Sequence, residues 1–188
     1  MIVIYLISNH LTQRIEDVFL KPRVQILFRD HMGLDSGMAP LRSWNARGEI
    51  FVILQFMLLA LIFWLPDFAA FPASVIGTVL KYLGFALLIA AGLNLGRNLT
   101  PLPKPKVDAQ LVTTGIFAWM RHPIYTALLL LTFGASLERG SWIALILSVC
   151  LAVLLEFKSR REEAWLLEQF SGYAAYRSRV KKFIPGIY

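Results

Sequence analysis

The feature that most constrains this chain is a set of apolar stretches long enough to cross a lipid bilayer. They cover Ile50 to Leu65, Ser74 to Gly96, and a double-length tract from Ile124 to Phe157. A membrane-spanning helix needs roughly 17 to 25 residues, so the last tract predicts two helices joined by a tight turn at Leu137 to Ser141. The sequence therefore predicts an all-α, polytopic membrane helix bundle of about four transmembrane helices.

The composition indicates a membrane protein and argues against a soluble one. Hydrophobic residues make up 57% of the 188 positions and charged residues only 16%, whereas a soluble domain carries about 25% charged residues. The formal net charge is +7. Because lysine and arginine gather on the cytoplasmic side of membrane proteins, this excess requires no nucleic-acid partner.

The positions of lysine and arginine in the connecting segments predict the orientation. The first group precedes the first span and contains Arg14, Lys21, Arg23, Arg29, Arg42 and Arg47. The second lies between the second and third spans and contains Arg97, Lys104, Lys106 and Arg121. The last follows the fourth span and contains Lys158, Arg160, Arg161, Arg177, Arg179, Lys181 and Lys182. On the opposite side, the connection 66–72 has none and the turn 137–141 has only Arg139. We therefore expect both termini and the 97–121 loop to face the cytoplasm.

This topology divides the chain into an N-terminal cytoplasmic or interfacial segment (1–49), a transmembrane bundle (50–157) and a C-terminal cytoplasmic helical segment (158–188). In the first part, apolar residues of RIEDVFLKPRVQILFR share one helical face. That pattern predicts an interfacial helix on the bilayer, although a helix docked on the bundle has the same pattern. Turn-forming residues predict a loop over 33–48.

The end of the second span and the start of the third carry polar residues. Gly92 and Gly96 form a pair of small residues typical of close helix packing. Asn94 lies near them, and RHPIY, residues 121–125, directly precedes the apolar run TALLLL. Such residues are either interfacial anchors or the wall of a site, and both interpretations fit the pentapeptide alone. Cys150 and the scattered histidines predict no metal site.

Beyond the fourth span, the chain keeps a helical pattern. Apolar residues of EFKSRREEAWLLEQFSGYAAY recur at helical spacing, so the helix is expected to leave the membrane and continue into the cytoplasm. Gly172 is expected to break this helix, and Pro185 with Gly186 to end regular structure.

Four sequence blocks then carry a resemblance: LGRNLTP, LVTTG, RHPIY, and REEAWLLEQF followed by GYAAYRSRV. In this order they resemble the isoprenylcysteine carboxyl methyltransferase and phospholipid methyltransferase family, with the chain as a bacterial-type member. The resemblance covers roughly residues 76 to 188. It implies an S-adenosylmethionine-dependent methyltransferase in which the 97–121 loop binds the cofactor and the segment 158–188 caps it.

The resemblance also implies which residues contact S-adenosylmethionine. Gln110, Leu111 and Val112 would surround the adenosine; Gly115, Phe117, Pro123 and Tyr125 would shape the pocket; His122 would lie near the methionyl carboxylate, and Glu162 or Glu163 would bind the methionyl ammonium. A buried zwitterion needs both charge partners, because an unpaired charge in an apolar site is costly. The family often has histidine in place of Gln110 and tyrosine in place of Phe117.

The methyl acceptor is expected to be a lipid or a lipidated small molecule, most consistent with a carboxylate such as a prenylcysteine-like group. Lys158, Arg160 and Arg161 are candidates for positioning it, with Lys158 where the family's substrate-binding arginine is expected. A carboxyl O-methyltransferase in the bacterial cytoplasmic membrane is therefore predicted, with its site facing the cytoplasm. The oligomeric state is left open.

Two alternatives remain at this level. One is an NADPH-dependent sterol-type reductase, whose C-terminal portion has a related helix arrangement and an ending similar to FIPGIY. The other is a non-catalytic membrane protein that retains the fold. Binding of S-adenosylhomocysteine distinguishes the methyltransferase from both.

Overall fold

The computed structural model describes residues 47–65 and 72–188. The predicted interfacial helix, most of the predicted N-terminal segment and nearly all of the 33–48 loop lie outside the described residues. The described residues belong to one compact unit.

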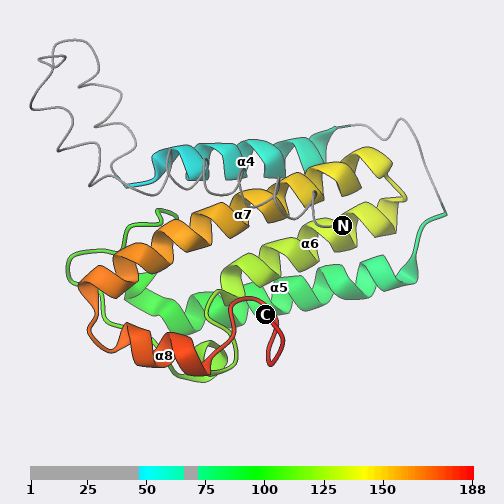
Figure 1. Ribbon diagram of the computed structural model, residues 1–188. Helices are drawn as coiled ribbons and strands as arrows, with labels where there is room; N and C mark the ends of the chain where they lie inside the picture. Colours follow the sequence, from blue (N-terminus) through cyan, green and yellow to red (C-terminus); the bar gives the residue numbers. More distant parts are fainter. Residues whose placement is uncertain (1–46, 66–71) are drawn as a thin grey trace, which may run out of the picture. The chain divides into compact units, whose positions relative to one another are not determined.

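Four long helices form this unit: α4 (Glu49–Trp64), α5 (Val75–Leu95), α6 (Pro123–Arg139) and α7 (Trp142–Gln169). Neighbouring helices in the bundle are α4 with α7, α7 with α6, and α6 with α5, so that α4 and α5 occupy its two edges (Figure 1). A short helix, α8 (Tyr173–Arg179), follows α7. Within the described ranges there is no strand, only an isolated parallel bridge between Met120 and Lys181, and the predicted all-α class is confirmed.

The turn between α6 and α7 lies where the sequence predicts it. Pro123 is the first residue of α6, a position at which its missing N–H costs nothing. Gly140 ends α6 in the left-handed conformation (φ 66°), and the side chain of Ser141 accepts a hydrogen bond from the Ala144 N–H at the start of α7. The double-length apolar tract is thus a helical hairpin.

The outer surfaces of these helices suit a bilayer. Helices α5 and α7 are long and apolar enough to cross one, whereas α4, with 16 residues, is apolar but shorter. Large apolar side chains such as Phe63, Phe85 and Val153 are exposed on α4, α5 and α7. An apolar surface of this extent is stable against lipid and not against water, so the chain is a polytopic membrane protein.

Close packing occurs between α5 and α6, but not at the glycine pair expected from the sequence. A Cβ atom on Gly77 would lie 2.3 Å from the Glu138 nitrogen, and one on Gly134 would lie 2.4 Å from the Lys81 nitrogen. Gly92 has no such neighbour within 4 Å. The expectation of close packing at Gly92 and Gly96 was therefore wrong, because the backbones of α5 and α6 approach each other nearer to the other end of α5.

The C-terminal part agrees with the prediction apart from two shifts. Helix α7 does continue past the apolar tract, to Gln169, but it ends at Phe170 and not at Gly172, which is the residue before α8. Regular helix ends at Arg179, well before Pro185, because the carbonyls of Lys181 and Lys182 accept hydrogen bonds from the Arg121 and His122 N–H groups just before α6.

Candidate cofactor and acceptor site

A cavity of about 390 Å³ lies at the end of the bundle where α5 ends and α6 begins. Its polar part is formed by residues of the 97–121 loop, the start of α6, the late turns of α7 and α8. Its apolar part reaches deeper into the bundle, where Phe56 and Leu59 of α4, Leu88 of α5 and Leu128 of α6 line it. The cavity therefore joins a polar chamber to an apolar one.

Two asparagines near the end of α5 hold the loop that forms the chamber wall. The Asn98 side chain donates to the Gln110 carbonyl (3.2 Å) and accepts from the Gln110 N–H (3.1 Å). The Asn94 side-chain oxygen accepts from the Ile116 N–H at 3.2 Å. Gly115 passes directly over Asn94 with φ +60°, where a Cβ would lie 1.6 Å from that oxygen. These contacts fix the loop to α5 and leave room for no side chain at position 115.

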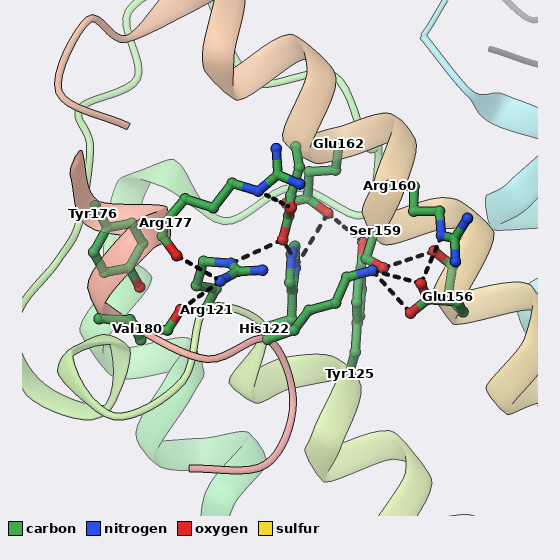
Figure 2. Close-up of polar contacts among 12 residues, drawn as sticks. Arg121, His122, Tyr125, Glu156, Ser159, Arg160, Glu162, Tyr176, Arg177 and Val180 are labelled. Atoms are coloured by element: carbon green, nitrogen blue, oxygen red, sulfur yellow. Dashed lines mark hydrogen bonds and ion pairs between the residues drawn. The ribbon is translucent and has the colours of Figure 1, made fainter. Parts of the chain in front are cut away.

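Glu163 of α7 is surrounded by two arginines and a histidine. Its carboxylate accepts from Arg121 Nε at 2.9 Å and lies 3.0 Å from His122 Nε2 and 3.2 Å from Arg177 Nε. Arg121 also donates to the carbonyls of Arg177 and Val180, which ties α8 and the segment after it to the start of α6 (Figure 2). Glu163 is not among the residues that line the cavity.

Glu162, the neighbouring carboxylate, does line the cavity. Its Oε2 accepts a hydrogen bond of 2.5 Å from the Tyr125 hydroxyl, and His122 Nδ1 lies 3.9 Å away (Figure 2). The rings of His122 and Tyr125 are stacked, with centroids 5.2 Å apart. The two adjacent glutamates thus have different surroundings. Glu163 pairs with Arg121 and Arg177, whereas Glu162 lines the cavity.

Lys158 places an ammonium in the cavity wall without a carboxylate beside it. The side chain is 2% exposed and donates to Gln55 Oε1 at 2.6 Å and to the Pro101 carbonyl at 3.0 Å. It also lies 5.2 Å from the centre of the Tyr125 ring. No carboxylate of residues 47–65 or 72–188 pairs with it within 4 Å, so this buried cation has only neutral acceptors.

The chain after α8 packs against the RHPIY block. The Arg121 and His122 N–H groups donate to the carbonyls of Lys181 and Lys182 at 2.9 and 3.0 Å. The Phe183 ring packs against the His122 and Tyr125 rings, with centroids 5.8 and 6.4 Å away. Residues 181–183 therefore fix the backbone and two side chains of the RHPIY block.

Two tyrosines of α8 complete the chamber, and they differ in their hydrogen bonding. The Tyr176 hydroxyl donates to the Phe117 carbonyl at 2.6 Å, and burial, opposed by the charge of Arg121, raises the pKa of Tyr176 to about 12. The Tyr173 hydroxyl is buried, and no group in the described part of the chain is its hydrogen-bond partner. Burial raises the pKa of Tyr173 well above its usual range, so this hydroxyl is a neutral donor on a residue that lines the cavity.

The structure brings most of the predicted site residues to one cavity. Its lining includes Gln110, Leu111, Val112, Phe117, His122, Pro123, Tyr125, Lys158 and Glu162. Gly115, Glu163, Arg160 and Arg161 are not part of that lining. Arg160 instead pairs with Glu156 at 2.7 Å (Figure 2), and Arg161 lies over the Trp165 ring at 4.9 Å.

Other contributors were not assigned to the site from sequence. They are Gln55, Asn94, Asn98, Arg121, Tyr173 and Tyr176. The signal available for Gln55 is a single amide inside the apolar run FVILQFMLLALIF, since a polar residue within a spanning helix marks a functional position. The tyrosines have helical spacing but no feature that separates a cavity wall from an ordinary core.

These features define a class of protein: a membrane helix bundle with a chamber at one end that contains one anionic and one cationic side chain, Glu162 and Lys158, and opens into an apolar cavity. In the described part of the chain, no group of three or more potential ligands is arranged for a metal ion. Residues 72–172 match the phospholipid methyltransferase family, and the chain belongs to that family.

Individual relatives agree with this assignment. The chain is 31% identical over 150 residues to the protein-S-isoprenylcysteine O-methyltransferase of Saccharomyces cerevisiae, a match that covers 73% of this chain and 61% of the relative. It is also 31% identical over 124 residues to the enzyme of that name from Schizosaccharomyces pombe, covering 63% of this chain and 51% of the relative. The chain thus spans about half to three-fifths of the length of these curated relatives.

A solved structure has a similar fold. The eukaryotic intramembrane Ras methyltransferase, an isoprenylcysteine carboxyl methyltransferase, superimposes with a TM-score of 0.52 at 26% sequence identity. The match covers 81% of this chain and 55% of that structure.

Proposed function

We propose that this protein is an S-adenosylmethionine-dependent carboxyl O-methyltransferase that acts on a lipid-tailed carboxylate, such as a prenylcysteine. The observation that carries the proposal is the pair of opposite charges in one cavity. Glu162 offers an anion to the ammonium of an amino-acid cofactor, and Lys158 offers a cation with no carboxylate of its own among the described residues. The names of the relatives support the reaction class.

The polar chamber fits S-adenosylmethionine. Glu162 would pair with the methionyl ammonium, and the orphan Tyr173 hydroxyl would donate to a polar atom of the cofactor. Leu111, Val112 and Phe117 offer an apolar surface for the adenine ring. When bound, the cofactor would supply an electrophilic sulfonium methyl group for transfer to a carboxylate oxygen of the acceptor, and Glu162 would hold the amino-acid end of the cofactor.

Lys158 then has the task of holding the acceptor. A carboxylate with a pKa near 4 is ionised at neutral pH, so the reaction needs no general base. The protein contributes by placing the two reactants in contact and by excluding water. Lys158 lies on the same face of α7 as Glu162, one turn earlier, so a carboxylate paired with Lys158 is adjacent to a cofactor paired with Glu162.

The apolar part of the cavity supports an acceptor with a hydrocarbon tail. Leu88 lies about two helical turns deeper in α5 than Leu95, which lines the polar end. Phe56 and Leu59 on α4 line the same deep region. A lipid tail in this region is removed from water, with a gain of about 25 cal/mol per Å² of apolar surface buried.

We further propose that the chamber faces the cytoplasm of a bacterial cell. The 97–121 loop and the C-terminal segment carry most of the basic residues of the described chain, and such residues concentrate on the cytoplasmic side. Cytoplasmic S-adenosylmethionine would then reach the chamber from water, while the acceptor reaches it from the bilayer.

The proposal is tested with purified protein in detergent. Methyl-labelled S-adenosylmethionine is supplied with N-acetyl-farnesylcysteine, and calorimetry is run with S-adenosylhomocysteine and with NADPH. We expect a labelled methyl ester and heat only from S-adenosylhomocysteine. Heat from NADPH alone would assign the chain to the reductase alternative, and heat from neither would favour a non-catalytic protein.

A further inference from the structure

Gln55 is a polar side chain in a helix that is otherwise apolar from Phe51 to Trp64. It is 7% exposed. Burying an amide is unfavourable unless its hydrogen bonds are made, so its position requires a physical reason. The oxygen of the amide is satisfied, because Gln55 Oε1 accepts a hydrogen bond from the Lys158 ammonium.

The NH₂ group of the Gln55 amide has no acceptor in the described part of the chain. Because a lysine ammonium only donates, Gln55 must turn its oxygen toward Lys158 and its NH₂ group away. Within residues 47–65 and 72–188 no group accepts from that nitrogen, and Gln55 lines the cavity. Gln55 therefore offers a free amide donor at the cavity, beside a buried ammonium that has no carboxylate within 4 Å among the described residues.

A lysine alone is a poor clamp for a carboxylate. Its ammonium is a point charge and lacks the paired N–H groups with which arginine binds both oxygens. A glutamine amide next to it supplies the missing uncharged donor.

We propose that Gln55 determines acceptor specificity: its amide N–H and the Lys158 ammonium together bind the two oxygens of the acceptor carboxylate. This inference rests on the proposed function. Through Gln55, helix α4 would favour an acid over a neutral lipid as acceptor. Each carboxylate oxygen would meet one donor, and the Gln55–Lys158 pair carries one positive charge. The Pro101 carbonyl holds the ammonium from its other side.

The test compares Gln55→Met and Gln55→Glu with a control on the same helix, Leu58→Met. Leu58 packs against the core and does not line the cavity. Methionine is close in shape to glutamine but donates no hydrogen bond. Glutamate instead pairs with Lys158 and repels a second carboxylate. Methyl transfer to N-acetyl-farnesylcysteine, and inhibition by its carboxamide, are measured for each variant, with S-adenosylhomocysteine affinity as the check on the cofactor chamber.

We expect Gln55→Met to raise the KM for the acid about tenfold or more, since a hydrogen bond to a charged group is lost. Gln55→Glu should abolish the preference for the acid over the carboxamide. Leu58→Met should match the parent. A purely structural tie between α4 and α7 predicts that acid and carboxamide weaken equally in Gln55→Met, and that result would overturn the inference.

The remaining outcomes are also decisive. If Gln55→Glu loses S-adenosylhomocysteine binding, its effect is on folding. The preference of Gln55→Met for the acid over the carboxamide then tests the inference. If the parent binds S-adenosylhomocysteine and methylates the acid while both variants keep its preference, the role of Gln55 is wrong and the proposed function stands. If the parent methylates no carboxylate, the proposed function itself fails.

Discussion

The Nε2 atom of His122 lies 3.0 Å from Oε1 of Glu163, although the two residues are 41 positions apart in the chain. The same imidazole has its Nδ1 atom 3.9 Å from Glu162. His122 therefore stands between a carboxylate that holds the fold together and one that faces the cavity. Adjacent residues with the same side chain have different surroundings, and this leads to different expected phenotypes.

Replacing each glutamate by glutamine separates cofactor binding from stability. Glu162→Gln removes the anion offered to the cofactor ammonium, so the affinity for S-adenosylhomocysteine should fall by about 2 to 5 kcal/mol, with a small change in unfolding temperature. Glu163→Gln leaves Arg121 and Arg177 without their carboxylate, so it should destabilise the fold by about 3 kcal/mol. Calorimetry and thermal unfolding in detergent measure the two effects. If both variants lost the same affinity for S-adenosylhomocysteine and neither was destabilised, the separate roles of Glu162 and Glu163 would be contradicted.

Tyr173→Phe provides a test of the cofactor chamber that does not rely on charge. Since the Tyr173 hydroxyl has no partner in the described structure, its removal should leave stability unchanged or slightly higher. Affinity for S-adenosylhomocysteine should fall by about 1 kcal/mol or more if the cofactor accepts its hydrogen bond. Tyr176→Phe is the matched control, because it loses a hydrogen bond within the protein and should lower stability. A Tyr173→Phe protein that binds as tightly as the parent would remove this hydroxyl from the site.

Gly115→Ala should displace the loop from α5. The new Cβ would be 1.6 Å from Asn94 Oδ1, and φ +60° is itself strained for alanine. We expect cofactor affinity to fall at least tenfold while the helix content by circular dichroism stays the same. Gly92→Ala serves as the control: among the described residues outside its own helical turn, no atom lies within 4 Å of the added Cβ, and alanine favours a helix. A loss in both variants would point to general damage to α5 and not to the loop.

Lys158→Met should affect the acceptor and spare the cofactor. Removing the ammonium leaves the acceptor carboxylate without its cation, so the specificity constant for that substrate should fall by about 10- to 100-fold. S-adenosylhomocysteine affinity should stay within a few-fold. Arg160→Ala is the comparison, because Arg160 pairs with Glu156 and does not line the cavity. A larger loss of transfer in Arg160→Ala than in Lys158→Met would restore Arg160 as the main acceptor-positioning residue.

Cysteine labelling in spheroplasts tests the orientation. In a Cys150→Ala background, an impermeant thiol reagent should modify Ala73→Cys, near the start of α5, and spare Ser178→Cys on α8. Both positions are exposed in the structure, so a difference reports the side of the membrane. The reverse pattern would contradict the cytoplasmic placement of the chamber.

Much of the fold was predictable, because bilayer thickness converts apolar length directly into helices. The tract 124–157 exceeds one span, and a charged interruption with Gly140 can only be a turn. Local chemistry also indicated the start of α6 at Pro123. The glycine pair of α5 was misleading, since spacing identifies a surface on which helices can approach closely without identifying which helix approaches it.

The number and approximate limits of the apolar helices, the position of the hairpin turn and many residues of the site can be read from the sequence. Helix packing is what turns Glu162 toward the cavity and Glu163 toward Arg121, and what brings Gln55 to Lys158 across 103 positions of chain. The physical reason is that helix limits depend on local properties of the chain, whereas the partner of a charge depends on rotation and packing between helices distant in sequence. Adjacent residues on α7 point about 100° apart, so a small rotation of that helix would exchange the roles of the two glutamates.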